Sequence, residues 1–204
     1  SRLSRGLGDV YKRQYVRRCF KASVMDFDDL LLKTNELLNK SPETLLKYQQ
    51  KFKYILVDEY QDTNYSQYLI VKALADRHEN LCVVGDDSQS IYSFRGANID
   101  NILNFKKHYP NSISYKLEQN YRSTKNIVQA ANSLINHNIL KLDKTIWTDN
   151  DVGDKIILNK SLSDSEEGRY VSTNIFELKN NFQLNNSSFA VLYRTNAQSR
   201  SIED

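Results

Sequence analysis

The sequence predicts an α/β protein with a parallel sheet flanked by helices, and three observations lead to that prediction. Residues Tyr54–Val57 and Leu81–Val84 are short apolar runs, typical of strands that are buried on both faces of a sheet. A helical pattern over about residues 66–77 separates them, and this order indicates two parallel strands joined by a crossover helix. Both runs end in carboxylates, which parallel pairing would place at one edge of the sheet, where open α/β folds bind ligands.

The composition limits the class of protein. A chain of 204 residues with a net charge of +3 can hold one large domain or two small ones, and it excludes neither nucleic acid nor an acidic ligand. The chain has no apolar run long enough to cross a bilayer and no secretory leader, so we expect a cytoplasmic protein without a membrane partner. Cys19 and Cys82 are predicted to be reduced thiols, with Cys82 in the core, and the three histidines lack zinc-site spacing.

The segment before the first strand has two parts. Residues 1–14 are rich in Arg, Lys and Gly without a convincing period, so we expect a disordered or non-native leader; a basic arm on nucleic acid is the alternative. Further on, Asp26 can cap a helix with leucines on its apolar side. Ser41 and Pro42 predict the start of a second helix, because the first helical position does not need the N–H that proline lacks.

The rest of the chain continues the alternation of helices and strands. The pattern predicts helices over about residues 99–109, after Ser123 or Thr124, and from Asp164 onward, with strands at 113–117, 156–158 and 189–193. We place a boundary between two lobes near residue 117, where one α/β layer ends and another begins.

Two adjacent carboxylates, Asp58 and Glu59, follow the first apolar run. Acids beside a buried strand need a compensating cation. A magnesium ion that carries a nucleotide would meet this need, because magnesium favours one or two carboxylates together with phosphate oxygens. A strand that runs into a solvated acidic turn is the alternative, and this stretch alone leaves both open.

The loop that follows the second strand presents Tyr92, Phe94 and Arg95 within four residues. Aromatic side chains interleaved with arginine can stack on unpaired bases and hold the nucleic-acid backbone. The alternative is that both rings pack into the core, and on this segment alone that alternative is favoured.

Three segments taken together indicate a protein family far more specifically than any one of them alone. Residues 57–64, 84–97 and 117–124 occur in the order of the second, third and fourth signature motifs of the UvrD/PcrA/Rep helicases of superfamily one, and they closely resemble them. Residues 25–31 and 189–200 resemble flanking segments of that family, so the resemblance covers about residues 15–204.

The resemblance implies a fold with two RecA-like lobes. In this family ATP and Mg²⁺ lie in the cleft between the lobes, and the enzyme moves 3′ to 5′ along single-stranded DNA. The chain would then consist of the leader 1–14, the C-terminal part of the first lobe over 15–117, and the N-terminal part of the second lobe over 118–204.

The resemblance also implies roles at the nucleotide. Asp58 corresponds to the acid that holds magnesium, and Glu59 to the base that deprotonates the attacking water. Gln89 corresponds to the γ-phosphate sensor, Arg122 to the arginine supplied across the cleft, and Tyr121 to the residue stacked on adenine. A packing role between the lobes is the alternative for Tyr121.

A second set of roles concerns DNA. The loop residues Tyr92, Phe94 and Arg95 correspond to strand contacts of the first lobe, and Arg194 with Asn196 to contacts of the second. The alternative for Arg194 is an ion pair with an acid such as Glu203. The implied partners are single-stranded DNA and duplex junctions, together with repair or replication proteins.

The phosphate-cradling pattern Gly-x-x-x-x-Gly-Lys-Ser/Thr does not occur in the sequence, because none of the six glycines is followed by lysine. We therefore expect an internal fragment of a helicase that does not turn over ATP alone. The alternatives are a remnant that only binds single-stranded DNA, and the helicase portion of a helicase–nuclease.

Overall fold

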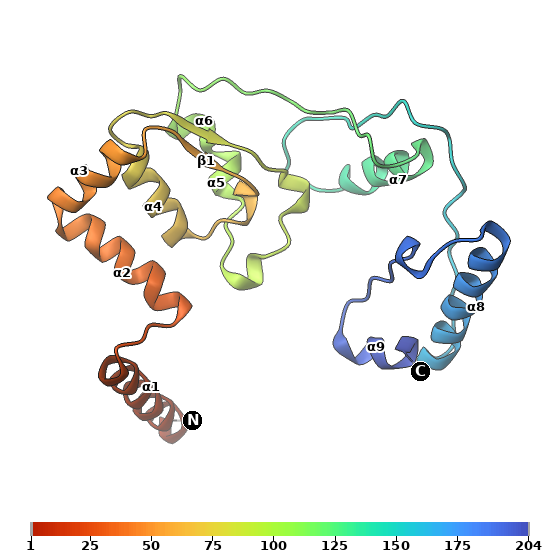
Figure 1. Cartoon of the computed structure of the whole chain (residues 1–204), viewed down its shortest axis with the longest axis horizontal. Helices are drawn as coiled ribbons and strands as arrows, with labels where there is room; N and C mark the ends of the chain where they lie inside the picture. The colour runs from red at the N-terminus through yellow and green to blue at the C-terminus, as the bar shows by residue number, and fades with distance from the viewer. Residues whose placement is uncertain (1, 204) are drawn as a thin grey trace. The chain divides into compact units, whose positions relative to one another are not determined.

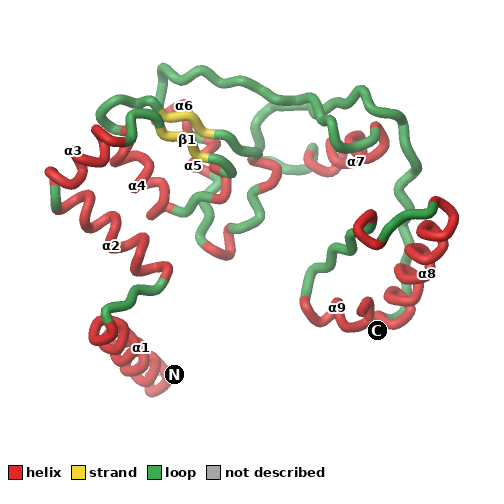
Figure 2. Tube along the Cα trace, viewed as in Figure 1, coloured by secondary structure: helices red, strands yellow, loops and turns green. Residues whose placement is uncertain are grey.

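The structure, a computed structural model, describes residues 2–203, with side chains from Gly8 onward except that of Ala197. Within this range the chain is mostly helical with two short strands, as Figures 1 and 2 show. It divides into two compact units. The first runs as far as Ser123 and adds Val128–Asp149, and the second consists of Thr124–Ile127 and the residues from Asn150 onward.

The first unit contains the predicted parallel pair. Strands β1 (Ile55–Val57) and β2 (Leu81–Val83) pair in parallel and are connected through helix α4 (Tyr65–Ala75). The helix begins with a capping box, in which Asn64 and Gln67 each accept a hydrogen bond from the other's backbone N–H. The predicted strand–helix–strand unit is confirmed, and it forms a small parallel sheet in a mixed helix-and-strand fold.

The prediction that both strands are buried on both faces is wrong. Leu56 lies opposite Cys82 in the parallel register, so the two side chains share a face of the sheet. Leu56 is 77% exposed and Cys82 is also exposed, which corrects the placement of Cys82 in the core. The helices described here leave this face uncovered, whereas Ile55 and Val57 on the other face are half-buried.

The two helices that precede the sheet form as predicted. Helix α2 (Phe27–Lys40) begins at Asp26, whose carboxylate accepts a hydrogen bond of 2.8 Å from the backbone N–H of Asp29. Helix α3 (Pro42–Lys51) begins after Ser41, with proline in its first turn. These helices pack against each other and against α4, as Figure 1 shows.

The core of the first unit lies where these helices meet the turns of the sheet. Its buried side chains include Leu38, Tyr60, Tyr68 and Ala75. The Tyr60 ring meets the ring of Phe105 edge to face, with 5.8 Å between the centroids.

The helix predicted over residues 99–109 is divided. It forms α5 (Asp100–Leu103) and α6 (Phe105–His108), separated by Asn104 at φ −97° and ψ 7°. Asparagine tolerates such a non-helical backbone because its short polar side chain competes with the helix for hydrogen bonds.

Helix α1 (Arg2–Ala22) corrects one part of the expectation for residues 1–14, that of a disordered leader. Regular helix replaces the predicted disorder from residue 2 onward, because this segment has no proline and its leucines, arginines and lysines favour helix strongly enough to accommodate two glycines. Its apolar side chains remain in water, with Val16 56% and Phe20 85% exposed.

Three predicted strands do not form: residues 113–117, 156–158 and 189–193 are not assigned to any strand. Ile113, Tyr115 and Leu117 are 76%, 82% and 84% exposed. Alternating side chains favour a strand only where another strand supplies the ladder, and these segments have no paired neighbour along their length.

The remaining helices are α7 (Lys125–Ile135), α8 (Asp164–Phe182) and α9 (Asn196–Glu203). The predictions of helices after Thr124 and from Asp164 are confirmed, and α8 is capped by Ser163. In the second unit α8 packs against α9. Among the helices described between residues 2 and 203, none is long and apolar enough to cross a membrane.

Candidate nucleotide site and DNA-contacting loop

The acidic pair lies at the carboxyl end of β1, as predicted. Asp58 and Glu59 are both exposed, and an oxygen of Asp58 accepts a hydrogen bond of 2.9 Å from the Glu59 backbone N–H. Glu59 has φ 49° and ψ 43°, in the left-handed region that is uncommon for residues other than glycine. This turn directs the next backbone N–H, that of Tyr60, to the carbonyl oxygen of Val84 at 3.0 Å. The two strand ends are therefore joined directly beyond the sheet.

A buried amide connects the two acidic turns. The side chain of Gln61 donates to Glu59 Oε2 at 2.8 Å and accepts from the backbone N–H of Asp86 at 3.0 Å. Gln61 is only 1% exposed. A Cβ at Gly85 would lie 2.5 Å from Gln61 Oε1, so only glycine leaves room for this amide. Gln61 was not predicted as a site residue, because its role depends on the close approach that Gly85 permits.

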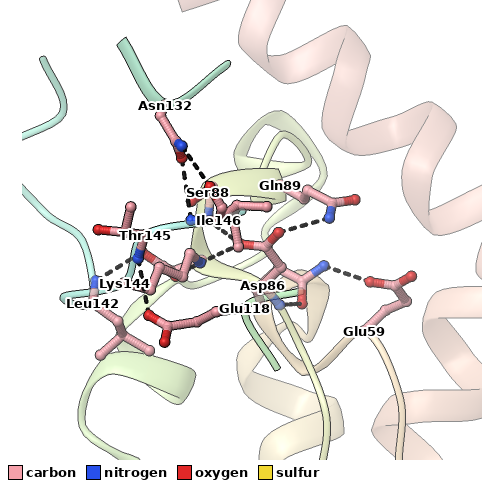
Figure 3. A network of polar contacts seen from close by, with 12 residues as sticks. Glu59, Asp86, Ser88, Gln89, Glu118, Asn132, Leu142, Lys144, Thr145 and Ile146 are labelled. Atoms are coloured by element: carbon pink, nitrogen blue, oxygen red, sulfur yellow. Dashed lines mark hydrogen bonds and ion pairs between the residues drawn. The ribbon is translucent and has the colours of Figure 1, made fainter. Parts of the chain in front are cut away.

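The turn after β2 orients Gln89. Asp86 accepts a hydrogen bond of 2.7 Å from the Gln89 side-chain amide and one of 2.9 Å from the backbone N–H of Ser88. Figure 3 shows these groups together with Glu59. Burial by itself raises the pKa of Asp86, but the hydrogen bonds from Lys144 and Gln89 outweigh burial and hold that pKa below its ordinary value.

Lys144 is a second site residue that the sequence analysis did not predict. Its ammonium pairs with one oxygen of Asp86 and one of Asp87. The Asp87 side chain is 1% exposed, and its second oxygen accepts from the backbone N–H of Leu142 at 2.8 Å. Burial alone lowers the pKa of Lys144, but the two carboxylates outweigh burial and raise that pKa above its ordinary value.

The segment that carries Lys144 is anchored within the first unit. The backbone N–H of Thr145 donates to a Glu118 carboxylate oxygen at 2.9 Å, and that of Trp147 donates to the Glu118 carbonyl oxygen at 2.9 Å. The Asn132 side chain bonds both backbone groups of Ile146. Figure 3 shows Asn132, Thr145 and Ile146 beside the acidic turn.

The turn that carries Tyr121 and Arg122 forms as predicted. Asn120 Oδ1 accepts from the backbone N–H groups of Arg122 and Ser123, at 2.9 and 2.7 Å. Tyr121 is 78% exposed, and its hydroxyl donates to Gln119 at 2.8 Å.

The structure brings three of the five predicted nucleotide residues together. Glu59 and Gln89 are connected through Gln61 and Asp86, and Asp58 adjoins Glu59. The Arg122 side chain is exposed, and within residues 2–203 no ion pair or hydrogen bond joins it to the acidic pair.

The loop after Gln89 presents its rings to solvent. The Arg95 guanidinium lies 5.5 Å from the ring centroids of both Tyr92 and Phe94, and the two centroids are 6.0 Å apart. Tyr92 is 39% and Phe94 77% exposed, so the alternative that both rings pack into the core is wrong. The backbone N–H of Ala97 returns to the Tyr92 carbonyl oxygen at 3.2 Å, which closes the loop.

Of the two predicted DNA contacts of the second unit, Asn196 is the first residue of α9 and Arg194 lies two residues before it. Arg194 and Asn196 are exposed, and the Arg194 backbone N–H donates to Gln198 at 3.0 Å. Among the ion pairs of the described residues, none joins Arg194 to Glu203.

The donors at the strand ends fit magnesium delivered with phosphate. Among the described residues no group of three or more His, Cys, Asp or Glu side chains could hold a metal ion by itself. Asp58 supplies a carboxylate at the strand end, and magnesium takes only one or two carboxylates from protein when phosphate oxygens and water complete its shell. Asp86 does not belong to this set, because Lys144 already neutralises it.

Two family models together match nearly the whole chain. The UvrD/REP helicase N-terminal domain matches residues 2–110, and the UvrD-like helicase C-terminal domain matches residues 115–204. The chain therefore belongs to the UvrD/Rep helicase family. The match also extends into residues 2–14, which the sequence-based resemblance left out.

Named relatives give the same result. The chain is 52% identical to an ATP-dependent DNA helicase PcrA of Leuconostoc citreum and 50% identical to that of Bacillus subtilis, each over 97% of the chain. It is 47% identical to a DNA helicase II of Rickettsia typhi over 94% of the chain. It covers 26%, 27% and 29% of these proteins, so it spans about a quarter of their length.

Proposed function

We propose that the chain is part of an ATP-dependent DNA helicase that moves 3′ to 5′ along single-stranded DNA, and that its two family domains are parts of two RecA-like lobes. The observation that carries this proposal is the network at the two strand ends. It fixes Glu59 and Gln89 relative to each other. Gln89 lies three residues before Tyr92, where the loop with exposed aromatic rings begins. Membership of the UvrD/Rep family supports the same conclusion.

Glu59 is the proposed general base. The Gln61 amide holds one oxygen of its carboxylate, and the side chain remains exposed to water. A carboxylate in this position can orient the water that attacks the γ-phosphate and accept its proton. Asp58 would hold Mg²⁺, which neutralises charge on the phosphates when it is bound.

Gln89 is the proposed sensor of the γ-phosphate. Its Nε2 is held by Asp86 at 2.7 Å, which leaves the amide oxygen to respond to a neighbouring group. The aromatic loop begins three residues later, so a shift of Gln89 would be transmitted to Tyr92 through a short backbone path. This arrangement would couple the state of the nucleotide to the affinity of the loop for DNA.

Arg122 and Tyr121 complete the proposed nucleotide site. An arginine that neutralises charge as the phosphoryl bond breaks is worth about 10³–10⁵ in rate. We propose this role for Arg122 and stacking on adenine for Tyr121. For DNA we propose contacts from Tyr92, Phe94 and Arg95 and, in the second unit, from Arg194 and Asn196.

A binding remnant is the second candidate. It is favoured by one observation: the aromatic loop exposes Phe94 beside the Arg95 guanidinium. Such a protein would hold single-stranded DNA without turnover. The helicase portion of a helicase–nuclease would share all the features described here, and a nuclease domain in the same gene would identify it.

An unwinding assay on the complete protein that contains this chain tests the proposal. We expect a duplex with a 3′ single-stranded tail to be unwound in the presence of ATP and Mg²⁺, and one with a 5′ tail to remain paired. Preference for the 5′ tail would overturn the direction, and DNA binding without ATP turnover would favour the remnant. The 204-residue chain alone is expected to bind DNA without turning over ATP.

A further inference from the structure

One lysine joins two segments that are far apart in the sequence. Lys144 Nζ pairs with Asp86 and Asp87, although 57 or 58 residues separate them, and its side chain is only 18% exposed. The other ion pairs of the described residues, Lys33 and Lys40 with Glu36, lie within one or two turns of α2 on its exposed surface. The Lys144 pairs therefore fix tertiary structure, whereas pairs on a helix surface contribute little.

The carboxylate that Lys144 holds is also the branch point of the nucleotide network. Its second oxygen, Asp86 Oδ2, accepts the Gln89 amide at 2.7 Å. The backbone N–H of the same residue donates to Gln61, whose amide in turn holds Glu59. A displacement of Asp86 would disturb Gln89 and Glu59 together.

We propose that Lys144 is a positioning residue for ATP hydrolysis, which holds Asp86 in the orientation that fixes Gln89 and, through Gln61, Glu59. This inference rests on the proposed function. Lys144 acts through Asp86 and not on the nucleotide. It makes turnover depend on the position of residues 142–147, which belong to the matched C-terminal family domain, while Asp86 belongs to the N-terminal one.

The charges explain why a cation is needed here. Asp86 and Asp87 are adjacent, and the Asp87 carboxylate is almost completely buried. Two neighbouring carboxylates repel each other, and a buried one without a cation is strongly unfavourable. Without Lys144 the more exposed Asp86 would turn toward water and release Gln89. The backbone N–H groups of Leu142 and Thr145 bond Asp87 and Glu118, so the segment around residue 144 would stay in place when Asp86 moves.

The direct test is Lys144→Met in the complete protein, with Lys141→Met as the matched control. Lys141 is exposed, lies three residues away and bonds only Asn136 among the contacts described for its side chain, at 2.8 Å. We expect Lys144→Met to lower kcat of the DNA-stimulated ATPase by at least about tenfold, with KM for ATP changed by less than about threefold, because an orienting contact is lost and not a nucleotide contact. Lys141→Met should leave both constants unchanged.

A conservative variant sharpens the test. Lys144→Arg keeps the charge and can bond both carboxylates, so it should recover most of kcat. Wild-type kcat in Lys144→Met, or a change confined to KM, would overturn the inference.

A second variant separates positioning from folding, because Lys144→Met leaves a buried carboxylate at Asp87 without its cation. Lys144→Met combined with Asp87→Asn removes that unpaired charge. We expect the double variant to melt close to wild type while kcat stays low, since Asp86 still lacks its cation. Wild-type kcat in a folded double variant would assign Lys144 a purely structural role and overturn the inference.

Parallel assays distinguish failure of this inference from failure of the proposed function. Wild type and Glu59→Gln are measured beside the lysine variants. A wild-type protein without DNA-stimulated turnover would overturn both. Turnover that is present in wild type, lost in Glu59→Gln and intact in Lys144→Met would overturn only the role of Lys144.

Discussion

Two neighbouring regions of the first unit are built in opposite ways. At the strand ends, Glu59 and Asp86 are held through the buried amide of Gln61. In the loop that follows, Phe94 is 77% exposed, its ring centroid lies 6.0 Å from that of Tyr92, and the Arg95 guanidinium lies 5.5 Å from both. The first region fixes polar groups in place, as the proposed proton transfer requires, and the second exposes flat rings, as the proposed contact with single-stranded DNA requires. Substitutions in the first should therefore change rate or stability, and those in the second should change affinity.

The largest expected effect is that of Glu59→Gln on turnover in the complete protein. Glutamine can still accept the hydrogen bond from Gln61 but cannot take a proton, so ATP turnover should fall by about 10²–10⁴-fold while nucleotide binding is retained. Steady-state ATPase rates and titration with a fluorescent nucleotide measure the two quantities. Glu36→Gln, the same change on the exposed surface of α2, is the control. Undiminished turnover would remove Glu59 from its proposed role.

Gly85→Ala should destabilise the hydrogen-bond network at the strand ends, because the added Cβ crowds it. The new Cβ would lie 2.5 Å from Gln61 Oε1 and 2.9 Å from a methyl group of Ile102. We expect the free energy of unfolding to fall by about 1–3 kcal/mol, the usual cost of overpacking. Denaturant titration of the 204-residue chain measures this. Gly8→Ala is the control, since a Cβ there meets nothing within 4 Å; equal stability of both variants would contradict the close approach at Gly85.

Phe94→Ala tests the exposed region. Loss of one ring should weaken binding of single-stranded DNA by about 1 kcal/mol, at the lower end of the range for stacking on a base. Fluorescence anisotropy with a labelled oligonucleotide measures the affinity. Phe182→Ala removes a ring that is 67% exposed at the end of α8 and should have no effect. Equal affinities of the Phe94 variant and wild type would indicate that this ring does not contact DNA.

The smallest expected effect is the pH dependence of the Lys144 pair. The folded-state pKa of Asp86 is lowered from 3.8, so its contribution is present above that value and is lost as pH falls through the lower folded pKa. The folded-state pKa of Lys144 is raised from 10.5, so its contribution is present below that value and is lost as pH rises through the higher folded pKa. The difference in unfolding free energy between wild type and Lys144→Met should thus stay constant from about pH 5 to about pH 9. A steep change within that range would assign the pH dependence to other groups.

Local patterns predicted the parts of the fold that depend on local physics. Asp26 and Ser41 cap the helices that they were expected to cap, and β1 and β2 pair because α4 returns the chain between them. The alternation in residues 113–117 gave a wrong strand, because a strand also needs a partner in register.

The site divides in the same way. The acidic pair and Gln89 could be found in the sequence, because their types and order match family motifs. Gln61 could not, since its role depends on the close approach that Gly85 permits. Lys144 could not either, because only folding brings it to a carboxylate 58 residues earlier.

The free thiol of Cys82, on the uncovered face of the sheet, makes that face chemically addressable. A maleimide dye should react with it readily in this chain, and the half-buried Cys19 supplies an internal reference for reagent quality. In a longer polypeptide that buries the same face, labelling would slow in proportion to the time the face stays closed. Mass spectrometry of timed samples would thus give the labelling rate of Cys82, and that rate measures how completely this face of the sheet is covered.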